Sequence, residues 1–212
     1  MDNSAEKIKE SLIKMASLTE ENFKLACDVK TQKDQVFQIE DQINKFHTQI
    51  DDECFKFLAL MKPLASDLRL IISIMKINAD LERIADQAVN IKRSQKLLDK
   101  FPQDLVNMAQ EVEAQIKDSI DAFINVDRRL SIDVIQRDQH VDEMNKKLLR
   151  SYINHIKNNN MDFDEAFGVI RIAKNLERIG DHCTNIAEDV IFLDTGEDIR
   201  HTRLNDNFTK DK

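Results

Sequence analysis

Two closely similar acidic segments, "DLERIADQAVNI" at 80–91 and "NLERIGDHCTNI" at 175–186, hold the side chains best suited to chemistry in this chain. In each segment a glutamate is followed four residues later by an aspartate, and four residues after that by an asparagine. Residues at this spacing lie on one face of an α-helix, so each segment presents a ladder of oxygen ligands. The ladders consist of Glu82, Asp86 and Asn90 in the first copy and of Glu177, Asp181 and Asn185 in the second.

Clustered carboxylates of this kind predict a site for metal cations. Like charges four residues apart destabilise a helix by about 0.2–0.5 kcal/mol, and a bound cation would offset that repulsion. Magnesium, manganese and iron ions suit oxygen ligands, and zinc fits an all-oxygen set less well. The alternative interpretation is a solvated helix face, on which Arg83 and Arg178 neutralise the acids as ordinary ion pairs.

Long helices are needed to position these ladders, because the chain contains few residues that favour turns. Only three glycines and two prolines occur in 212 residues, and no alternation typical of β-strands dominates the sequence. Ser66, soon after Pro63, and Asp162, after "NNNM", are residue types that cap helix N-termini. We expect helices near 5–29, 33–60, 65–99, 104–127, 131–157 and 162–193.

The chain also contains an internal repeat. Glu177 follows Glu82 by 95 residues, and flanking apolar residues align at the same offset. A unit of this length matches three helices, and Pro102 separates the two copies. The sequence therefore predicts an all-α fold of two tandem three-helix bundles, with six long helices. The expected parts are a first repeat at 1–100, a second repeat at 101–194 and a polar, flexible C-terminal tail at 195–212.

Each ladder should meet a second polar pair on the preceding helix. Short turns join the two helices of each hairpin, so the helices run antiparallel and adjacent. Asn44 lies 19 residues before Pro63 and Glu82 lies 19 residues after it, which places both at the same height. In the second hairpin the corresponding distances from Asn159 are 17 and 18 residues. The expected metal ligands are Glu40, Asn44, Glu82 and Asp86 in the first repeat and Asp138, Asp142, Glu177 and Asp181 in the second, with Asn90 and Asn185 as additional candidate ligands.

The bulk composition limits the partners and the location. A net charge of −8 argues against binding of nucleic acid, which requires basic patches. Three cysteines without CxxC spacing argue against a disulfide framework or a structural zinc site. The most apolar run, "LIISIM" at 70–75, is too short to span a bilayer, and the N-terminus has no apolar signal core. We expect a cytoplasmic protein that does not insert into membranes.

No arrangement typical of an enzyme accompanies the ladders. The sequence has no Gly-rich phosphate loop and no ExxH motif of the kind found in di-iron helical bundles. His47 and His182 are the only histidines near the ladders. We therefore expect a non-catalytic protein, and the alternative is an enzyme that uses several metals for redox or hydrolytic chemistry.

Ile71 and Met75, on the partly polar stripes, are candidates for core packing or for docking and dimerisation.

The sequence resembles the PhoU family of phosphate-signalling proteins. The resemblance is carried by "SDLRL" at 66–70, by the two ERIxD segments and by "GEDIRH" at 196–201, and it covers residues 18 to 201. It implies two tandem three-helix bundles, often dimeric, with metal ions at E(D)xxxD motifs. Asn44 departs from the family pattern, which has an aspartate there, and Val89 stands where many members have a polar ligand.

The resemblance further implies a role in negative regulation of phosphate uptake and of phosphate-responsive signalling. The implied partners are the phosphate ABC transporter and a sensor histidine kinase, and the implied assembly is a homodimer. The implied cofactors are divalent or trivalent metal ions, namely iron, magnesium or manganese. An alternative under the same resemblance is the regulatory domain of a sodium–phosphate cotransporter.

Overall fold

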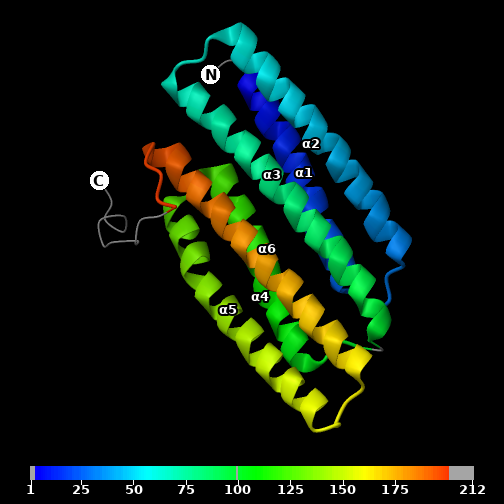
Figure 1. Ribbon diagram of the computed structural model, residues 1–212. Coiled ribbons are helices and arrows are strands. Elements are labelled where there is room, and N and C mark those ends of the chain that lie inside the picture. Colours follow the sequence, from blue (N-terminus) through cyan, green and yellow to red (C-terminus); the bar gives the residue numbers. More distant parts are fainter. Residues whose placement is uncertain (1–2, 99, 201–212) are drawn as a thin grey trace.

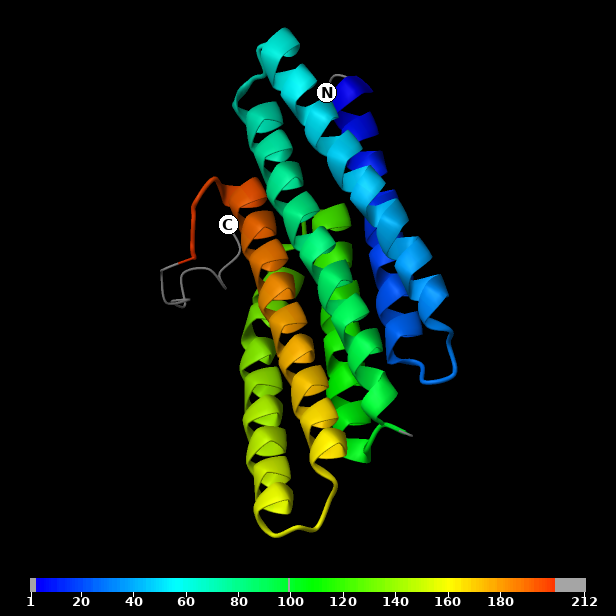
Figure 2. The ribbon, with the colours of Figure 1, turned by 45° about the vertical axis from the view of Figure 1, so that its right-hand side comes forward.

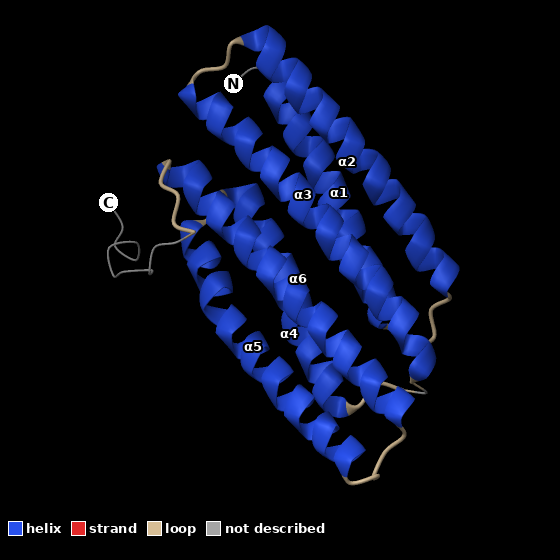
Figure 3. Ribbon diagram, in the orientation of Figure 1, coloured by secondary structure: helices blue, strands red, loops and turns tan. Residues whose placement is uncertain are grey.

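The structure is a computed structural model of the 212-residue chain, and it describes residues 3–98 and 100–200. Within these ranges every regular element is a helix (Figure 3), which confirms the expected all-α fold. The helices are α1 (Asn3–Cys27), α2 (Lys33–Met61), α3 (Ala65–Ser94), the short 3-10 helix η1 (Gln95–Leu97), α4 (Gln103–Asn125), α5 (Arg128–Lys157) and α6 (Phe163–Thr195).

The six α-helices form two bundles that lie side by side. Helices α1–α3 make the first bundle and α4–α6 the second, and α3 packs against α6 between them (Figures 1 and 2). These two central helices run antiparallel, as the colour order in Figure 1 shows. One connected hydrophobic cluster includes Leu12 and Ile74 of the first bundle and Val112 and Ile172 of the second. The two tandem bundles are thus confirmed, and they share a continuous core.

Capping residues explain where several helices begin and end. Asp162 caps α6 as expected, because its carboxylate accepts hydrogen bonds from the amides of Asp164 and Glu165 at 2.9 and 3.4 Å. The expected cap at Ser66 is wrong, because α3 already begins at Ala65 after Leu64, whose side chain makes no capping bond. The third helix is also shorter than expected, since the chain tightens into η1 after Ser94.

The apolar stripes predicted for the third and sixth helices are buried as expected. Ile71, however, is completely buried as well, so it belongs to the core and the interpretation as a docking residue is wrong. Met75 is half-buried and packs against the same core. The buried stripe residues are Leu70, Ile74, Ile77, Leu81, Ile84, Ala88 and Ile91 on α3, and Val169, Ile172, Leu176, Ile179, Cys183 and Ile186 on α6.

A buried ion pair joins the two bundles. The ammonium group of Lys76 on α3 lies 3.0 Å from a carboxylate oxygen of Asp189 on α6, whose side chain is only 3% exposed. Burial raises the pKa of Asp189, and the hydrogen bond from Lys76 acts in the opposite direction. Ser73 adds a hydrogen bond to the backbone carbonyl of Asp189 at 3.3 Å. The carboxylate therefore depends on a partner from the other bundle.

The segment after α6 folds back onto the second bundle. Gly196 ends the helix with a φ of 78°, a left-handed conformation that glycine adopts readily. Ile199 is buried against Ile132 and Ile191, and Arg200 lies 3.7 Å from Asp189. Ile199 and Arg200 of the expected tail thus contact the helices, and residues 201–212 lie outside the described residues.

Across residues 3–98 and 100–200, no helix contains a stretch that is both long enough and apolar enough to span a lipid bilayer.

The Lys76→Met variant should lower the free energy of unfolding by about 2 kcal/mol at neutral pH, because the buried carboxylate of Asp189 loses its closest cation. Urea unfolding followed by circular dichroism measures this change. The double variant Lys76→Met/Asp189→Leu is the matched control and should recover most of the loss, since it leaves no charge unpaired. A single variant as stable as the unmodified chain would show that the pair contributes nothing.

Candidate metal centre

The four acids of the second repeat come together where α5 packs against α6. Burial, followed by the charges of neighbouring carboxylates, raises the pKa of Asp138 from 3.8 to about 6. Burial also raises the pKa of Asp181, again with added contributions from acidic neighbours. The carboxylates that act on Asp138 are Asp181, Asp142 and Glu177, which are the other three residues of the expected second site.

Gly180 allows this close approach of α5 and α6. A Cβ atom at this position would lie 2.8 Å from Oδ1 of Asp138, a separation that would force the carboxylate to move. It would also lie 3.2 Å from Oε1 of Gln115 on α4. Gln115 is completely buried, and neither polar atom of its side chain has a hydrogen-bond partner. An unpaired buried amide beside a carboxylate cluster is an environment that fits a cation with oxygen ligands.

Two lysines pair with the outer acids of this cluster. Lys174 forms an ion pair with Glu177, and Lys146 lies 3.4 Å from Asp142. The side chains of both lysines are at least half exposed, so they remain available to water while the acids face the cluster. The alternative interpretation named Arg178 as the partner of this ladder, and lysines pair with Glu177 and Asp142 instead.

The acids of the first repeat have partners within α2 and within α3. The amide of Asn44 donates a hydrogen bond of 2.6 Å to Glu40 on the same helix. Arg83 lies 3.4 Å from Glu82 and 3.3 Å from Asp86, as the ion-pair interpretation anticipated. Each pair therefore finds a partner along its own helix. The two sites predicted from the repeat are not equivalent, because the second has four acids where the first has three and an asparagine.

Of the two additional candidate ligands, Asn185 takes part in the contact between the bundles. The amide of Asn185 donates to Asp80 on α3 at 3.1 Å, across the contact between the bundles. His182 also approaches Asp80, with 2.8 Å between its Nδ1 and a carboxylate oxygen. Asn90 is half-buried, and its backbone carbonyl accepts a hydrogen bond from Ser94. Asn185 thus contributes to the interface in this conformation.

Sequence reasoning missed Asp80 and Gln115. Asp80 falls on the stripe Ser73, Ile77, Asp80, Ile84, whose spacing could have indicated a second buried face on this helix. Gln115 lies among the buried positions Val112, Ile116 and Ser119 of α4, and a glutamine beside the apolar residues of this stripe was the available signal.

The candidate ligands of the second repeat lie near one another without forming a complete coordination group. In the part of the chain that the structure describes, no three or more His, Cys, Asp and Glu side chains form a group ready to hold a metal ion. Binding at the cluster of Asp138, Asp142, Glu177 and Asp181 would therefore require side-chain rotations.

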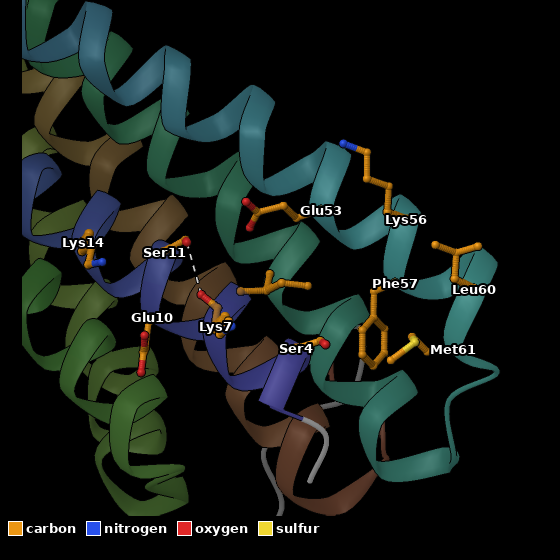
Figure 4. A pocket seen from close by; sticks show the side chains of 11 residues that line it. Ser4, Lys7, Glu10, Ser11, Lys14, Glu53, Lys56, Phe57, Leu60 and Met61 are labelled. Atoms are coloured by element: carbon orange, nitrogen blue, oxygen red, sulfur yellow. Dashed lines mark hydrogen bonds between the residues drawn. The ribbon is translucent and has the colours of Figure 1, made fainter.

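A separate groove of about 610 Å³ lies between α1 and α2 (Figure 4). Ile8 and Phe57 contribute to its apolar lining, together with Met61, and Lys7 and Lys56 are among its charged residues. It lies toward the end of α2 that is remote from Glu40 and Asn44. The groove is therefore not part of the acidic site.

The fold and the paired ladders define a class of helical proteins built from two tandem three-helix bundles, with an acidic site between neighbouring helices. The PhoU domain matches this chain twice, at residues 12–94 and 105–190. The chain belongs to the PhoU family, which confirms the resemblance inferred from the ERIxD segments.

Individual relatives agree with this assignment. The chain is 36% identical to the phosphate-specific transport system accessory protein PhoU homolog of Pseudomonas putida, over 94% of this chain and 82% of the relative. The homolog of Pseudomonas aeruginosa is 37% identical over 94% of this chain and 87% of its own length.

Solved structures of the family share the fold. The crystal structure of PhoU from Pseudomonas aeruginosa superposes with a TM-score of 0.87 at 35% identity, covering 92% of this chain and 98% of that one. The phosphate transport system regulatory protein PhoU from Streptococcus pneumoniae gives a TM-score of 0.84 at 26% identity, covering 93% and 98%.

Neutralising Asp138 should stabilise the metal-free protein at neutral pH. A carboxyl whose pKa is raised to about 6 in the folded state favours folding only while it is protonated. The stabilisation of the folded state by this carboxyl is fully present below pH 3.8 and is lost as the pH rises through about 6. Asp138→Asn should therefore raise the unfolding temperature in EDTA by about 2–4 °C at pH 7.5, after allowance for solvent screening, and by less at pH 4.5.

The matched control for this measurement is Glu143→Gln, which changes an exposed acid on the same helix and should shift neither temperature. Equal effects of Asp138→Asn at the two pH values would show that its carboxyl is not destabilised by its neighbours.

Proposed function

We propose that this chain is a non-catalytic, metal-binding regulator of phosphate uptake and of phosphate-responsive signalling. The observation that carries the proposal is the similarity, over nearly the whole chain, to proteins named as accessory to the phosphate-specific transport system. Those names favour an accessory protein over the regulatory domain of a sodium–phosphate cotransporter. They equally favour a regulator over an enzyme with several metals.

The proposed metal site lies between α5 and α6 and uses Asp138, Asp142, Glu177 and Asp181. The raised pKa of Asp138 supports it, because such a carboxyl has unfavourable neighbours that a cation would compensate. An all-oxygen ligand set suits magnesium, manganese or iron and suits zinc less well. A bound ion would neutralise the cluster and link the two helices. The first repeat, with Glu40, Asn44, Glu82 and Asp86, would bind more weakly because Asn44 and Arg83 already satisfy its acids.

The proposed mode of action is contact with the phosphate ABC transporter and with the sensor histidine kinase. Each repeat exposes apolar residues where its last two helices are joined. Leu60 and Leu64 are each 76% exposed at the turn between α2 and α3. Phe163 and Phe167 stack on each other near the turn between α5 and α6, at 59% and 42% exposure. Exposed aromatic and aliphatic groups of this kind suit protein contacts.

These two turns lie at opposite ends of the molecule (Figures 1 and 2), so one chain could contact two partners at once. The proposal places the protein in the cytoplasm as a homodimer that acts as a negative regulator, as membership of the family suggests.

Removing two ligands of the second site should abolish its metal. Glu177→Ala with Asp181→Ala is expected to lower bound manganese or iron to the level of the first repeat alone, while the helical circular dichroism stays unchanged. Elemental analysis of the purified protein measures the metal per chain. Glu82→Ala with Asp86→Ala is the matched control and should remove less metal. Unchanged metal in the first variant would rule out these ligands.

The hairpin of the second repeat can be tested for partner contact. Phe163→Ser with Phe167→Ser should reduce capture of the transporter ATPase subunit or of the kinase by more than about tenfold, since exposed aromatic anchors dominate such interfaces. Co-purification from the host organism with quantitative mass spectrometry provides the measurement. Phe55→Ser, which changes a phenylalanine of similar exposure on α2, is the control. Equal capture by both variants would exclude this hairpin as the contact.

A further inference from the structure

Gln115 is a buried polar residue that neither the fold nor the four carboxylates explain. It lies in the middle of α4, has 0% exposure and leaves both polar atoms of its side chain without hydrogen-bond partners. Burying an amide in this state costs free energy, and folded proteins seldom tolerate it without a reason.

The first repeat holds a buried amide at this place whose nitrogen has a hydrogen-bond partner and whose oxygen has none. Aligning residue 12 with residue 105, where the two matched PhoU domains begin, places Asn22 over Gln115. Asn22 is also completely buried, but its amide nitrogen donates a hydrogen bond of 2.7 Å to the carbonyl of Val36. The longer side chain of Gln115 makes no such bond to the backbone. The two repeats therefore use the same buried position differently.

Gln115 is directed toward the acidic cluster of the second repeat. A Cβ atom on Gly180 would meet Oε1 of Gln115 at 3.2 Å and Oδ1 of Asp138 at 2.8 Å, so both oxygens border the same small space beside α6. The residue after Gly180 is Asp181, another member of the cluster. The corresponding residue of the first repeat is Ala85, which is buried and carries a methyl group where Gly180 has none.

Resting on the proposed metal function, we propose that the Gln115 amide oxygen is an interior ligand of the cation bound by Asp138 and its neighbours, and that Gly180 keeps the space for it. The site would then be built from three helices, α4, α5 and α6, rather than from two. A hard cation takes six or more oxygen ligands, and a neutral amide supplies one without adding to the repulsion among the acids. The lack of a partner for Oε1 of Gln115 would then be explained, because its partner is the ion.

Two variants test the proposal through metal affinity. Gln115→Leu removes the amide while filling the buried site, and Gly180→Ala displaces the two oxygens without removing either. Calorimetric titration with Mn²⁺ alone should show affinity at the second site reduced by about 10- to 100-fold in each variant. Gln110→Leu, the same change on the exposed face of α4, is the matched control and should leave the affinity unchanged.

A second measurement follows metal binding by the unmodified protein, so it does not depend on whether a variant binds metal. The side-chain amide signals of Gln115 in a ¹H–¹⁵N spectrum, identified by their absence in Gln115→Leu, should shift when Mg²⁺ is added to the unmodified protein. Those of Asn22 should not, since its amide is already hydrogen-bonded to the backbone.

The outcomes separate this inference from the proposed function. Unchanged Mn²⁺ affinity in Gln115→Leu, or unshifted Gln115 signals in a protein that binds metal, would overturn the role of the amide and leave the four-carboxylate site intact. An unmodified protein that binds no Mn²⁺ would overturn the metal function itself, and this inference with it. If Gln115→Leu does not fold, the Gly180→Ala titration and the amide signals of Gln115, then assigned through the backbone, decide the question.

Discussion

Packing of α3 against α6 is the contact on which the rest of the structure depends. It joins two bundles of similar sequence into one body with one continuous core. Two polar contacts across it fix the antiparallel register. Lys76 on α3 pairs with Asp189 on α6. One turn further along α3, Asp80 contacts His182, which lies two turns before Asp189 on α6. A buried carboxylate that depends on the other bundle penalises any arrangement in which the bundles separate.

Glu177 and Asp181 on α6 lie close to Asp138 on α5, whereas Asn185 of the same ladder bonds Asp80 across the contact between the bundles. In the second repeat, burial and then the charges of neighbouring carboxylates raise the pKa of Asp138. The first repeat has one acid fewer, because Asn44 stands in place of an acid, and Arg83 pairs with Glu82 and Asp86. The duplicated sequences have thus diverged into one site with three acids and one with four. Destabilising charge that is retained in one copy is what a functional site is expected to show.

The proposed function connects this charge to the ends of the molecule. A cation between α5 and α6 would tie together the two helices whose turn carries the exposed pair Phe163 and Phe167. The metal and the docking surface would therefore lie on one hairpin. A bound cation that holds α5 and α6 together would also favour one arrangement of the exposed phenylalanines. The opposite hairpin, with Leu60 and Leu64, lacks such a concentrated site and would serve as a constant surface.

The sequence by itself determined the helices, the repeat and the identity of the acids. Scarce glycine and proline and the 3.6-residue period are local properties, so they predicted α2, α5 and α6 to within three residues of their bounds. Nearly equal distances from Asn159 predicted that Asp138 and Asp142 lie near Glu177 and Asp181, and these four acids do influence one another.

Only the tertiary structure decided which partner each polar group finds. Asp80 and Asn185 are 105 residues apart, and Gln115 lies on a helix that no acidic motif marks. Burial, charge compensation and the space beside Gly180 arise from contacts between distant helices, so no local pattern could distinguish the second site from the first. Periodicity determines which face of a helix a residue occupies, whereas the packing of several helices determines what lies opposite that face.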